Sequence, residues 1–502
     1  MKTPSNELKE LINTLTPAEK NKFKDYCKSK RDAGTIEYLK LFAVYCGKSF
    51  ASDSEIKQAH KFKNLPRIKA YLNQQLFNFL TETAQKSVDK DLCDMIVLAE
   101  VLIKRSLFKQ SLAVLAKAKN LANLEERYNY TLIINQKTMN AHNYLRNVDY
   151  WNYYTQEYRD KEFAATINKL VIDQDVQSHG LNMTRFQVRQ DELLRSPEAL
   201  KEFEKTLLPL LKKGDDYPQT IASKFQYNSI VGYYYLQLNN FDKAIFYIKH
   251  CCELYDQNKY LHSTRPMFRV ITLGNLMCAY ATGKKFEELK QVLLKLNSLH
   301  FKDKFHASFA LQLYWVYESN YCKNRYDYPN RKKSLKKLEL DFLKQYTEVF
   351  IQNKIPIVTN ISINYFIDGN PKKALEWLNK LDEYSTHTNY KSLFAVIRLY
   401  RLIIYFEMDK IDLLQYSIAN TYRSLQHSNL LFNLEKVLIK MLGKLLEENS
   451  PKYREQVYKV ARAELEPLKK DNSVWHVLLI FNFMGWLDCK IESTNFNHLM
   501  NK

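Results

Sequence analysis

The chain has 502 residues, of which 10 are glycine and 12 are proline, about 2% each against usual frequencies of about 7% and 5%. The two closest glycines, Gly274 and Gly283, are nine positions apart. The sequence therefore contains no GxGxxG loop, no GxxxxGK[ST] loop and no GxSxG turn, which excludes the dinucleotide, Walker-type nucleotide and nucleophile-elbow sites that need them. The formal net charge of +20 favours anionic partners such as nucleic acid, anionic lipid or acidic peptides.

The composition also bounds the class of protein. With 46% hydrophobic residues, the chain can bury a large core, and its length suggests roughly three domains or one elongated array. No apolar leader follows Met1, and the longest apolar run, residues 474–487, is shorter than the about 20 residues of a membrane-spanning helix. The eight cysteines form no CxxC pair, which is typical of reduced thiols. We therefore expect a cytoplasmic protein without a membrane span.

Helical periodicity dominates the chain, and its first elements lie in a basic region, residues 1–90, with 17 Lys and Arg against 10 Asp and Glu. Thr16, Pro17 and Glu19 form a capping-box pattern that predicts the start of a helix. Residues 54–60 and 66–79 are predicted to be two helices joined by a short turn. This hairpin has two interpretations: a cap of a helical array, or a helix-turn-helix that binds DNA.

The DNA-binding interpretation of this hairpin depends on cations that would contact phosphates. Those around the turn are Lys57, Lys61, Lys63, Arg67 and Lys69. The candidate base-reading residues come late in the second helix and point to different faces, which weakens the interpretation; they are Asn73, Gln74 and Gln75.

Aromatic residues gather between positions 144 and 158, interleaved with Arg146 and Arg159. Such a surface can stack unpaired bases or anchor a peptide, although aromatic residues at helical spacing more often form the seam between helices. The aromatic residues are Tyr144, Tyr150, Trp151, Tyr153, Tyr154 and Tyr158.

Residues 227–248 read YNSIVGYYYLQLNNFDKAIFYI, which predicts two antiparallel helices. Small residues at Gly232 and Ala244 allow the helices to approach closely, Asn239 and Asn240 form the turn, and Phe241 opens the second helix. In these positions the segment resembles a tetratricopeptide repeat, a helix pair that stacks into superhelical arrays.

Four further segments match the same offsets, and in them the second helix is expected to open at Phe108, Phe286, Pro371 and Ile411. We therefore predict an all-α fold, an α-α superhelix in which residues 91–502 form a tetratricopeptide-like solenoid of antiparallel helix pairs. The opening of the chain, ELKELI at 7–12, LTPAEK at 15–20, FK at 23–24 and YLKLF at 38–42, also resembles a family of uncharacterised bacterial helical-repeat proteins. That family has no known activity, so it implies a fold and no function.

The sequence contains no convergent set of metal ligands or catalytic groups. The best nucleophile candidate, Cys251 beside His250 and Cys252, has adjacent residues that point about 100° apart on a helix, so packing is the favoured interpretation. The basic run at 330–337 is interpreted as a solvated loop and first helical turn. We accordingly nominate no catalytic, cofactor-binding or metal-binding residue and expect no cofactor.

The sequence thus favours a non-catalytic scaffold or adaptor that binds a protein or peptide, one carrying acidic groups, on a basic and tyrosine-rich concave surface. The first alternative is a nucleic-acid-binding regulator that uses the basic N-terminal hairpins. An enzyme of unrecognised type is the weaker second alternative, because a dedicated site should leave some convergent polar signature.

Overall fold

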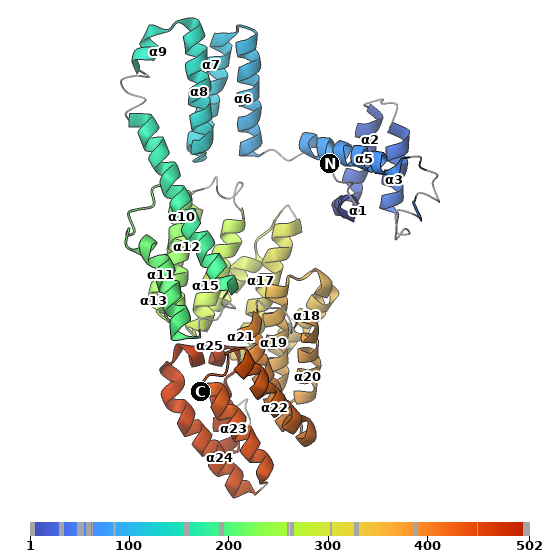
Figure 1. Cartoon of the computed structure of the whole chain (residues 1–502), viewed down its shortest axis with the longest axis vertical. Coiled ribbons are helices and arrows are strands. Elements are labelled where there is room, and N and C mark those ends of the chain that lie inside the picture. Colours follow the sequence, from blue (N-terminus) through green and yellow to red (C-terminus); the bar gives the residue numbers. More distant parts are fainter. Residues whose placement is uncertain are drawn as a thin grey trace. The chain divides into compact units, whose positions relative to one another are not determined.

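The computed structural model describes residues 6–29, 35–47, 55–56, 62, 64–83, 87–153, 161–189, 195–258, 261, 266–301, 304–325, 331–384, 390–448 and 450–494. These residues form α-helices and short 3-10 helices, and they contain no β-strand. The prediction of an all-α fold is confirmed. The chain divides into two compact units, residues 1–94 and 95–502, and each is described by itself (Figure 1).

The first unit is a small helical bundle with an aromatic core. The Phe23 ring lies 4.7 Å from that of Phe42 and 5.3 Å from that of Phe79, measured between centroids. The predicted capping box is present: Thr16 N donates to Glu19 Oε2 at 2.8 Å, and Glu19 N donates to Thr16 Oγ1 at 3.2 Å. Its helices are α1 (Asn6–Thr14), α2 (Pro17–Ser29), α3 (Thr35–Cys46) and α5 (Leu65–Thr83).

The second unit is an array of consecutive helices, which begins within α6 (Val88–Lys104). The helices of its first half are α7 (Phe108–Leu124), α8 (Tyr128–Leu145), α9 (Val148–Tyr153), α10 (Ala164–Arg189), α11 (Pro197–Leu211), α12 (Ile221–Gln237), α13 (Phe241–Gln257), α15 (Pro266–Thr282) and α16 (Phe286–Asn297). Those of the second half are α17 (Lys304–Asn324), α18 (Arg331–Lys344), α19 (Ile351–Ile367), α20 (Pro371–Asn379), α21 (Lys391–Glu407), α22 (Ile411–His427), α23 (Asn433–Glu447), α24 (Pro451–Leu465), α25 (Asn472–Ile480) and α26 (Phe483–Glu492). Short 3-10 helices follow α18, α20 and α24; they are η2 (Tyr346–Glu348), η3 (Asp382–Tyr384) and η5 (Glu466–Lys470).

Each helix of the array packs mainly against its neighbours in the chain. Hairpin partners such as α12 and α13, or α19 and α20, contact each other extensively. Alternate helices also contact each other, for example α15 with α17 and α17 with α19. Contact restricted to neighbouring units is the arrangement of a helical repeat protein. The prediction of a helical-repeat array is therefore confirmed.

The predicted repeats coincide with helix hairpins of one kind. In all five, the second helix begins at the predicted residue: α7 at 108, α13 at 241, α16 at 286, α20 at 371 and α22 at 411. A three-residue turn precedes each of these helices, and its middle residue has a positive φ, between 54° and 74°; these residues are Ser106, Asn239, Lys284, Gly369 and Asp409.

The same hydrogen bond closes each of these turns. In the second hairpin, for example, Asn240 N donates to Tyr235 O at 2.9 Å across the left-handed residue Asn239. This is the Schellman pattern, which satisfies carbonyl groups at a helix end and usually employs glycine. Among the five turns, only the one at Gly369 has a glycine at the left-handed position. The scarce glycines are therefore not the general means by which this chain ends its helices.

Close contacts between the two helices of a hairpin occur where small residues were predicted. A Cβ placed on Gly232 would lie 2.8 Å from Ile248 Cγ1 and 3.4 Å from Ala244 O. In the two hairpins where a serine occupies one of these offsets, its hydroxyl bonds across the helices. Ser111 donates to Ala99 O at 3.0 Å, and Ser362 donates to Ala374 O at 2.7 Å. The prediction that small residues permit close helix packing is confirmed at these positions.

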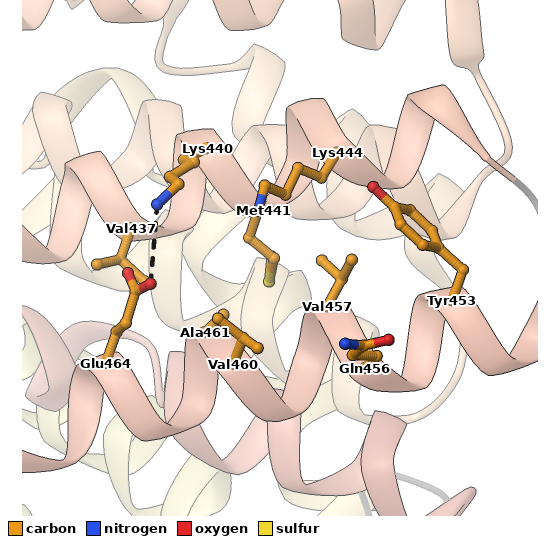
Figure 2. Close-up of a pocket in the computed structure, with 10 residues that line it drawn as sticks. All are labelled: Val437, Lys440, Met441, Lys444, Tyr453, Gln456, Val457, Val460, Ala461 and Glu464. Carbon is orange, nitrogen blue, oxygen red and sulfur yellow. Dashed lines mark ion pairs between the residues drawn. The ribbon is translucent and has the colours of Figure 1, made fainter.

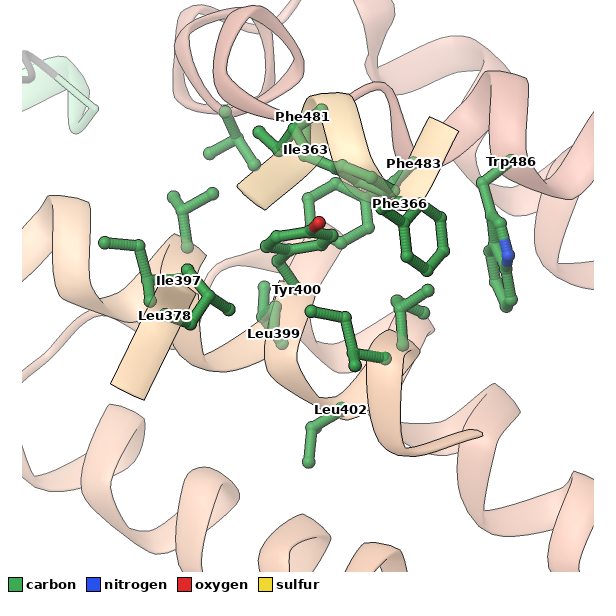
Figure 3. Packing of buried hydrophobic residues seen from close by; sticks show 14 of the residues in the cluster. Ile363, Phe366, Leu378, Ile397, Leu399, Tyr400, Leu402, Phe481, Phe483 and Trp486 are labelled. Carbon is green, nitrogen blue, oxygen red and sulfur yellow. The ribbon is translucent and has the colours of Figure 1, made fainter. Parts of the chain in front are cut away.

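The C-terminal helices return to the middle of the array. Phe481, which lies between α25 and α26, packs with its ring centroid 4.6 Å from that of Tyr400 on α21 and 5.6 Å from that of Phe366 on α19. Figure 3 shows these rings together with Phe483 and Trp486 in one buried cluster. The apolar run at 474–487 is therefore part of the core.

No single helix in the described ranges is both long and apolar enough to cross a membrane. The pair α25 and α26 reaches that length and composition only when taken together, and it is bent by 71°.

Two glycine substitutions test the close packing of the hairpins. We expect Gly232→Ala to lower the free energy of unfolding by about 1–3 kcal/mol, because α13 must move away from the new methyl group. Gly443→Ala is the matched control: nothing lies within 4 Å of its added Cβ, so it should stabilise α23 by about 0.5–1 kcal/mol. Urea denaturation of both variants provides the measurement, and equal stabilisation by the two substitutions would contradict the packing argument.

Candidate functional site

The position of α25 is set by contacts with helices distant in the sequence. The Lys323 ammonium, on α17, donates to Leu479 O at 3.0 Å and to Ile480 O at 3.1 Å. A cation at this end also complements the helix dipole of α25. Trp475 stacks on Phe241, at the start of α13, with centroids 5.4 Å apart. These contacts hold α25 against α13 and α17.

A buried charged cluster provides a further attachment. The Arg195 guanidinium, just before α11, donates to the Glu435 carboxylate on α23, and both side chains are at most 1% exposed. The Arg195 guanidinium also lies 4.4 Å from the centre of the Phe432 ring. His476 of α25 is buried beside this pair; burial, aided by the charge of Arg195, lowers its pKa to about 4. The pair therefore connects segments 240 positions apart.

The return of α25 and α26 creates a groove with α15, α16 and α17, which we call the basic groove. It encloses about 1040 Å³. Its walls are the turn between α15 and α16, the C-terminal end of α17, and the helices α24 to α26. The lining residues are Ala281, Thr282, Lys284, Phe286, Asn320, Asn324, Arg325, Arg462, Lys469, Trp475, Leu478, Leu479, Asn482, Met484, Gly485 and Asp488.

Cations outnumber anions in this lining, four to one. Arg462 Nε is paired with Asp488 at 2.6 Å, and Lys469 is paired with Glu466 at 2.8 Å. Hydrogen bonds from Lys469 and Arg462 lower the pKa of Glu466 to about 2. Lys284 differs from these two cations, because it is exposed and has no carboxylate within ion-pair distance among the residues described. It therefore presents an uncompensated positive charge at the rim.

Amide groups give the basic groove donors and acceptors besides its charges. Asn324 Nδ2 donates to both the backbone and the side-chain oxygen of Asn320, at 2.9 and 3.1 Å. Asn482 caps α26 by accepting from Gly485 N at 2.9 Å. A carboxamide can bond both the N–H and the C=O of a peptide backbone. The lining thus combines amides, cations and apolar residues such as Leu478.

Tyrosine is absent from this lining, although the sequence predicted a tyrosine-rich concave surface. The tyrosines of α12 and α13 lie instead near the seam between their helices. Tyr235 stacks on Tyr247 with centroids 5.7 Å apart, and Tyr227 and Tyr247 both donate to Asp215 at about 3.1 Å. These rings serve packing between helices, and the aromatic groups of the basic groove are Phe286 and Trp475.

The aromatic segment predicted from residue 144 onward is partly exposed. Tyr144 is 65% exposed and stacks on Phe108. Trp151 Nε1 donates to Asn143 Oδ1 at 2.7 Å, and Tyr153 donates to Glu162 at 2.8 Å. Tyr150 stacks on His142 with centroids 3.8 Å apart, and Arg146 ends α8 in the left-handed conformation. Tyr154, Tyr158 and Arg159 lie outside the described residues.

The N-terminal hairpin is described in its second helix, α5, and at residues 55–56, 62 and 64 before it. Lys57, Lys61 and Lys63 lie outside the described residues. Arg67 is exposed, whereas Lys69 is 1% exposed and its ammonium lies 6.0 Å from the centre of the Tyr45 ring. In this conformation Lys69 does not present its charge to a phosphate.

The base-reading candidates of α5 differ in exposure. Gln74 is exposed and donates to Asn78 at 3.1 Å, while Asn73 and Gln75 are half-buried.

The nucleophile candidates Cys251 and His250 are engaged in contacts within the fold. Cys251 is buried and donates to Phe225 O at 3.4 Å, and burial raises the pKa of its thiol to about 12, the opposite of what an activated thiolate needs. His250 faces Glu253 at 3.2 Å. Within the ranges the structure describes, no group of His, Cys, Asp and Glu is arranged to hold a metal ion.

The basic run that begins at residue 330 contributes to the fold. Arg331 is buried, and it donates to Cys322 O at 2.7 Å, to Asn364 Oδ1 at 2.7 Å and to Asp368 Oδ1 at 2.9 Å. Lys332 and its neighbouring lysines on α18 are exposed.

Sequence reasoning missed every lining residue of the basic groove. Arg325 and Trp475 are 150 positions apart in the sequence, and only the return of α25 brings their segments together. A signal was available in the run at 474–487, because an apolar stretch too short for a membrane must be buried in the protein.

No protein-family model matches the chain, and no curated protein is significantly similar to it.

A double-mutant cycle tests the attachment between α11 and α23. We expect Arg195→Met or Glu435→Met alone to lower the free energy of unfolding by about 3–5 kcal/mol, because each leaves a buried charge without its partner. The double variant should recover most of that loss. Additive losses in chemical denaturation would show that the two side chains are not coupled.

Stability should also depend on pH through His476. Its pKa is about 4 in the fold against 6.5 ordinarily, so the unfolded chain binds the proton first as the pH falls. The contribution of neutral His476 to the free energy of unfolding is therefore fully present above about pH 6.5 and is lost as the pH falls toward 4. The loss amounts to up to about 3 kcal/mol, because each unit of pKa difference corresponds to about 1.4 kcal/mol.

His476→Gln, which does not titrate, isolates this term, since Glu435 is common to both proteins. Wild type should lose more stability than His476→Gln between pH 7.5 and pH 4.5 in thermal melts. Parallel pH profiles would contradict the assignment.

Proposed function

We propose that this protein is a non-catalytic scaffold that binds an acidic segment of a partner protein in the basic groove. The observation that carries the proposal is the lining: four cations, three asparagines and an apolar wall around about 1040 Å³. We further infer that the array is of the tetratricopeptide type, as the 227–248 segment indicates. We also infer that the protein acts in a bacterial cytoplasm, on the resemblance of residues 7–42 to a bacterial helical-repeat family and on the cysteine usage.

The chemistry of the lining favours an extended peptide over a small ligand. An extended chain presents N–H and C=O groups along its length. Asn320 and Asn324 offer amides from α17, and Asn482 offers one from the start of α26. Acidic side chains of the peptide would approach Lys284, which has no anion of its own, and would compete with Glu466 for Lys469. Part of the binding energy is therefore offset by the loss of an existing exposed pair.

Charge reversal at the groove tests the proposal. An array of peptides with clustered Asp and Glu, interspersed with apolar residues, would be probed with the labelled full-length protein at moderate salt. We expect Lys284→Glu/Lys469→Glu to weaken binding of the acidic peptides at least about tenfold, because it places like charges at the rim.

Lys332→Glu/Lys333→Glu is the matched control, since it changes the net charge equally on the exposed face of α18. It should leave binding of the acidic peptides unchanged. An equal loss of binding in both variants would show that binding depends only on the net charge of the protein, and would contradict the proposal. Tighter binding of a DNA duplex than of any acidic peptide, with a steep salt dependence, would favour the nucleic-acid alternative instead.

A further inference from the structure

A second groove lies between α23 and α24, on a different face of α24 from Arg462. Figure 2 shows it as a channel with one helix along each side. It encloses about 140 Å³, and we call it the hairpin groove. Its lining comes from these two helices alone: Val437, Lys440, Met441, Lys444, Tyr453, Gln456, Val457, Val460, Ala461 and Glu464.

The floor of the hairpin groove is apolar. Met441, Val457 and Ala461 form its buried part, and Val460 is 45% exposed beside them. Elsewhere in the array the next helix packs on a hairpin, as α15 does on α13 and α21 does on α20. After α24 the chain turns through η5 into α25. Helix α26 packs on α24 but does not line the groove, and neither does α25.

One rim of the hairpin groove is cationic. Lys436, Lys440 and Lys444 lie at intervals of four along α23, so they share one side of that helix. Lys440 makes an exposed ion pair with Glu464 across the groove, at 3.8 Å, which contributes little. Among the described residues, no carboxylate lies within ion-pair distance of Lys436 or Lys444. Two positive charges on this rim are therefore available to an anionic partner.

The apolar floor selects the conformation of an occupant. An extended peptide would lay N–H and C=O groups over floor residues such as Met441 and Val457, which cannot bond them, and Gln456 is the one carboxamide in the lining. An unsatisfied backbone group carries a penalty. A helix satisfies these groups internally and offers an apolar face. The rim along α24 runs from Tyr453 to Glu464, about 16 Å at 1.5 Å per residue, which is about three turns of a helix.

We propose that the hairpin groove binds an amphipathic α-helix of a partner protein. Its apolar side chains, at i, i+4 and i+7, pack on Met441, Val457 and Val460. Acidic residues on one flank of that helix face Lys440 and Lys444. This is helix-in-groove recognition, and it differs in conformation and place from the acidic segment assigned to the basic groove.

A designed peptide tests this proposal directly. The probe is a labelled peptide of about 18 residues, long enough to form a helix, with Leu at i, i+4, i+7 and i+11 and Glu along one flank. Fluorescence anisotropy with the full-length Lys284→Glu/Lys469→Glu variant, whose basic groove repels acidic peptides, should show saturable binding at least about tenfold tighter than for a scrambled peptide of the same composition. Exchange of the Glu residues for Lys should weaken binding similarly. Equal binding of the designed and scrambled peptides would overturn the proposal.

Two groove variants and one control locate the binding site. Val460→Asp, at a half-exposed position that the fold tolerates, and Lys440→Glu/Lys444→Glu should each reduce binding at least about tenfold. Lys284→Glu/Lys469→Glu, in the basic groove, should leave it unchanged, so failure here is distinct from failure of the proposed function. Circular dichroism melts confirm that each variant is folded.

The occupant itself is tested by sedimentation velocity. Wild type and Val460→Asp should sediment alike. A wild-type dimer that Val460→Asp converts to a monomer would show that a second copy fills the groove, and this result would overturn the proposal, as would undiminished binding of the peptide by Val460→Asp.

Discussion

The capping of α25 by Lys323 is the contact on which the C-terminal half of the array depends. A lysine buried in a helical core is unfavourable unless its ammonium finds acceptors, because burial disfavours the charged form. Here burial lowers the pKa of Lys323 to about 8, and the acceptors are the last carbonyls of α25. The same bonds satisfy groups that a helix end leaves open. The Lys323 side chain thus offsets both the cost of burying its own ammonium and the cost of leaving the last carbonyls of α25 unbonded. Both gains require α25 to be in place.

Much of the helical hairpin pattern could be predicted from the sequence because each hairpin is specified locally. The turn that ends at Asn240 needs a left-handed residue, a capping side chain and an apolar residue to open the next helix, all within a few positions. The basic groove follows no such local rule. Its walls meet because Lys323 bonds the last carbonyls of α25 and Trp475 stacks on Phe241. Neither contact is indicated by the spacing of residues in the sequence. The abundance of tyrosine predicted a tyrosine-rich concave surface, which stays a prediction; Tyr235 and Tyr247 stack on each other between α12 and α13.

Under the two proposals, the grooves would divide the recognition of acidic partners by backbone conformation. The basic groove supplies amides that can replace the hydrogen bonds of an extended chain, whereas the hairpin groove supplies an apolar floor that accepts only a chain whose bonds are already made. Lysines flank both, through Lys284 in one and Lys444 in the other. From composition alone the excess of positive charge has no particular location. In the structure, part of it lies beside two grooves, one lined with amides and one with an apolar floor.

Helix α24 is a wall of both grooves: Arg462 lines one, and Val460 and Glu464 line the other. A small rotation of this helix about its axis would therefore alter both surfaces together. Any ligand that favours one setting of α24 changes the free energy of binding at the opposite side, and thermodynamic linkage requires the effect to be equal in both directions. The sharing of one helix thus gives the array a route for communication between two occupants that never touch.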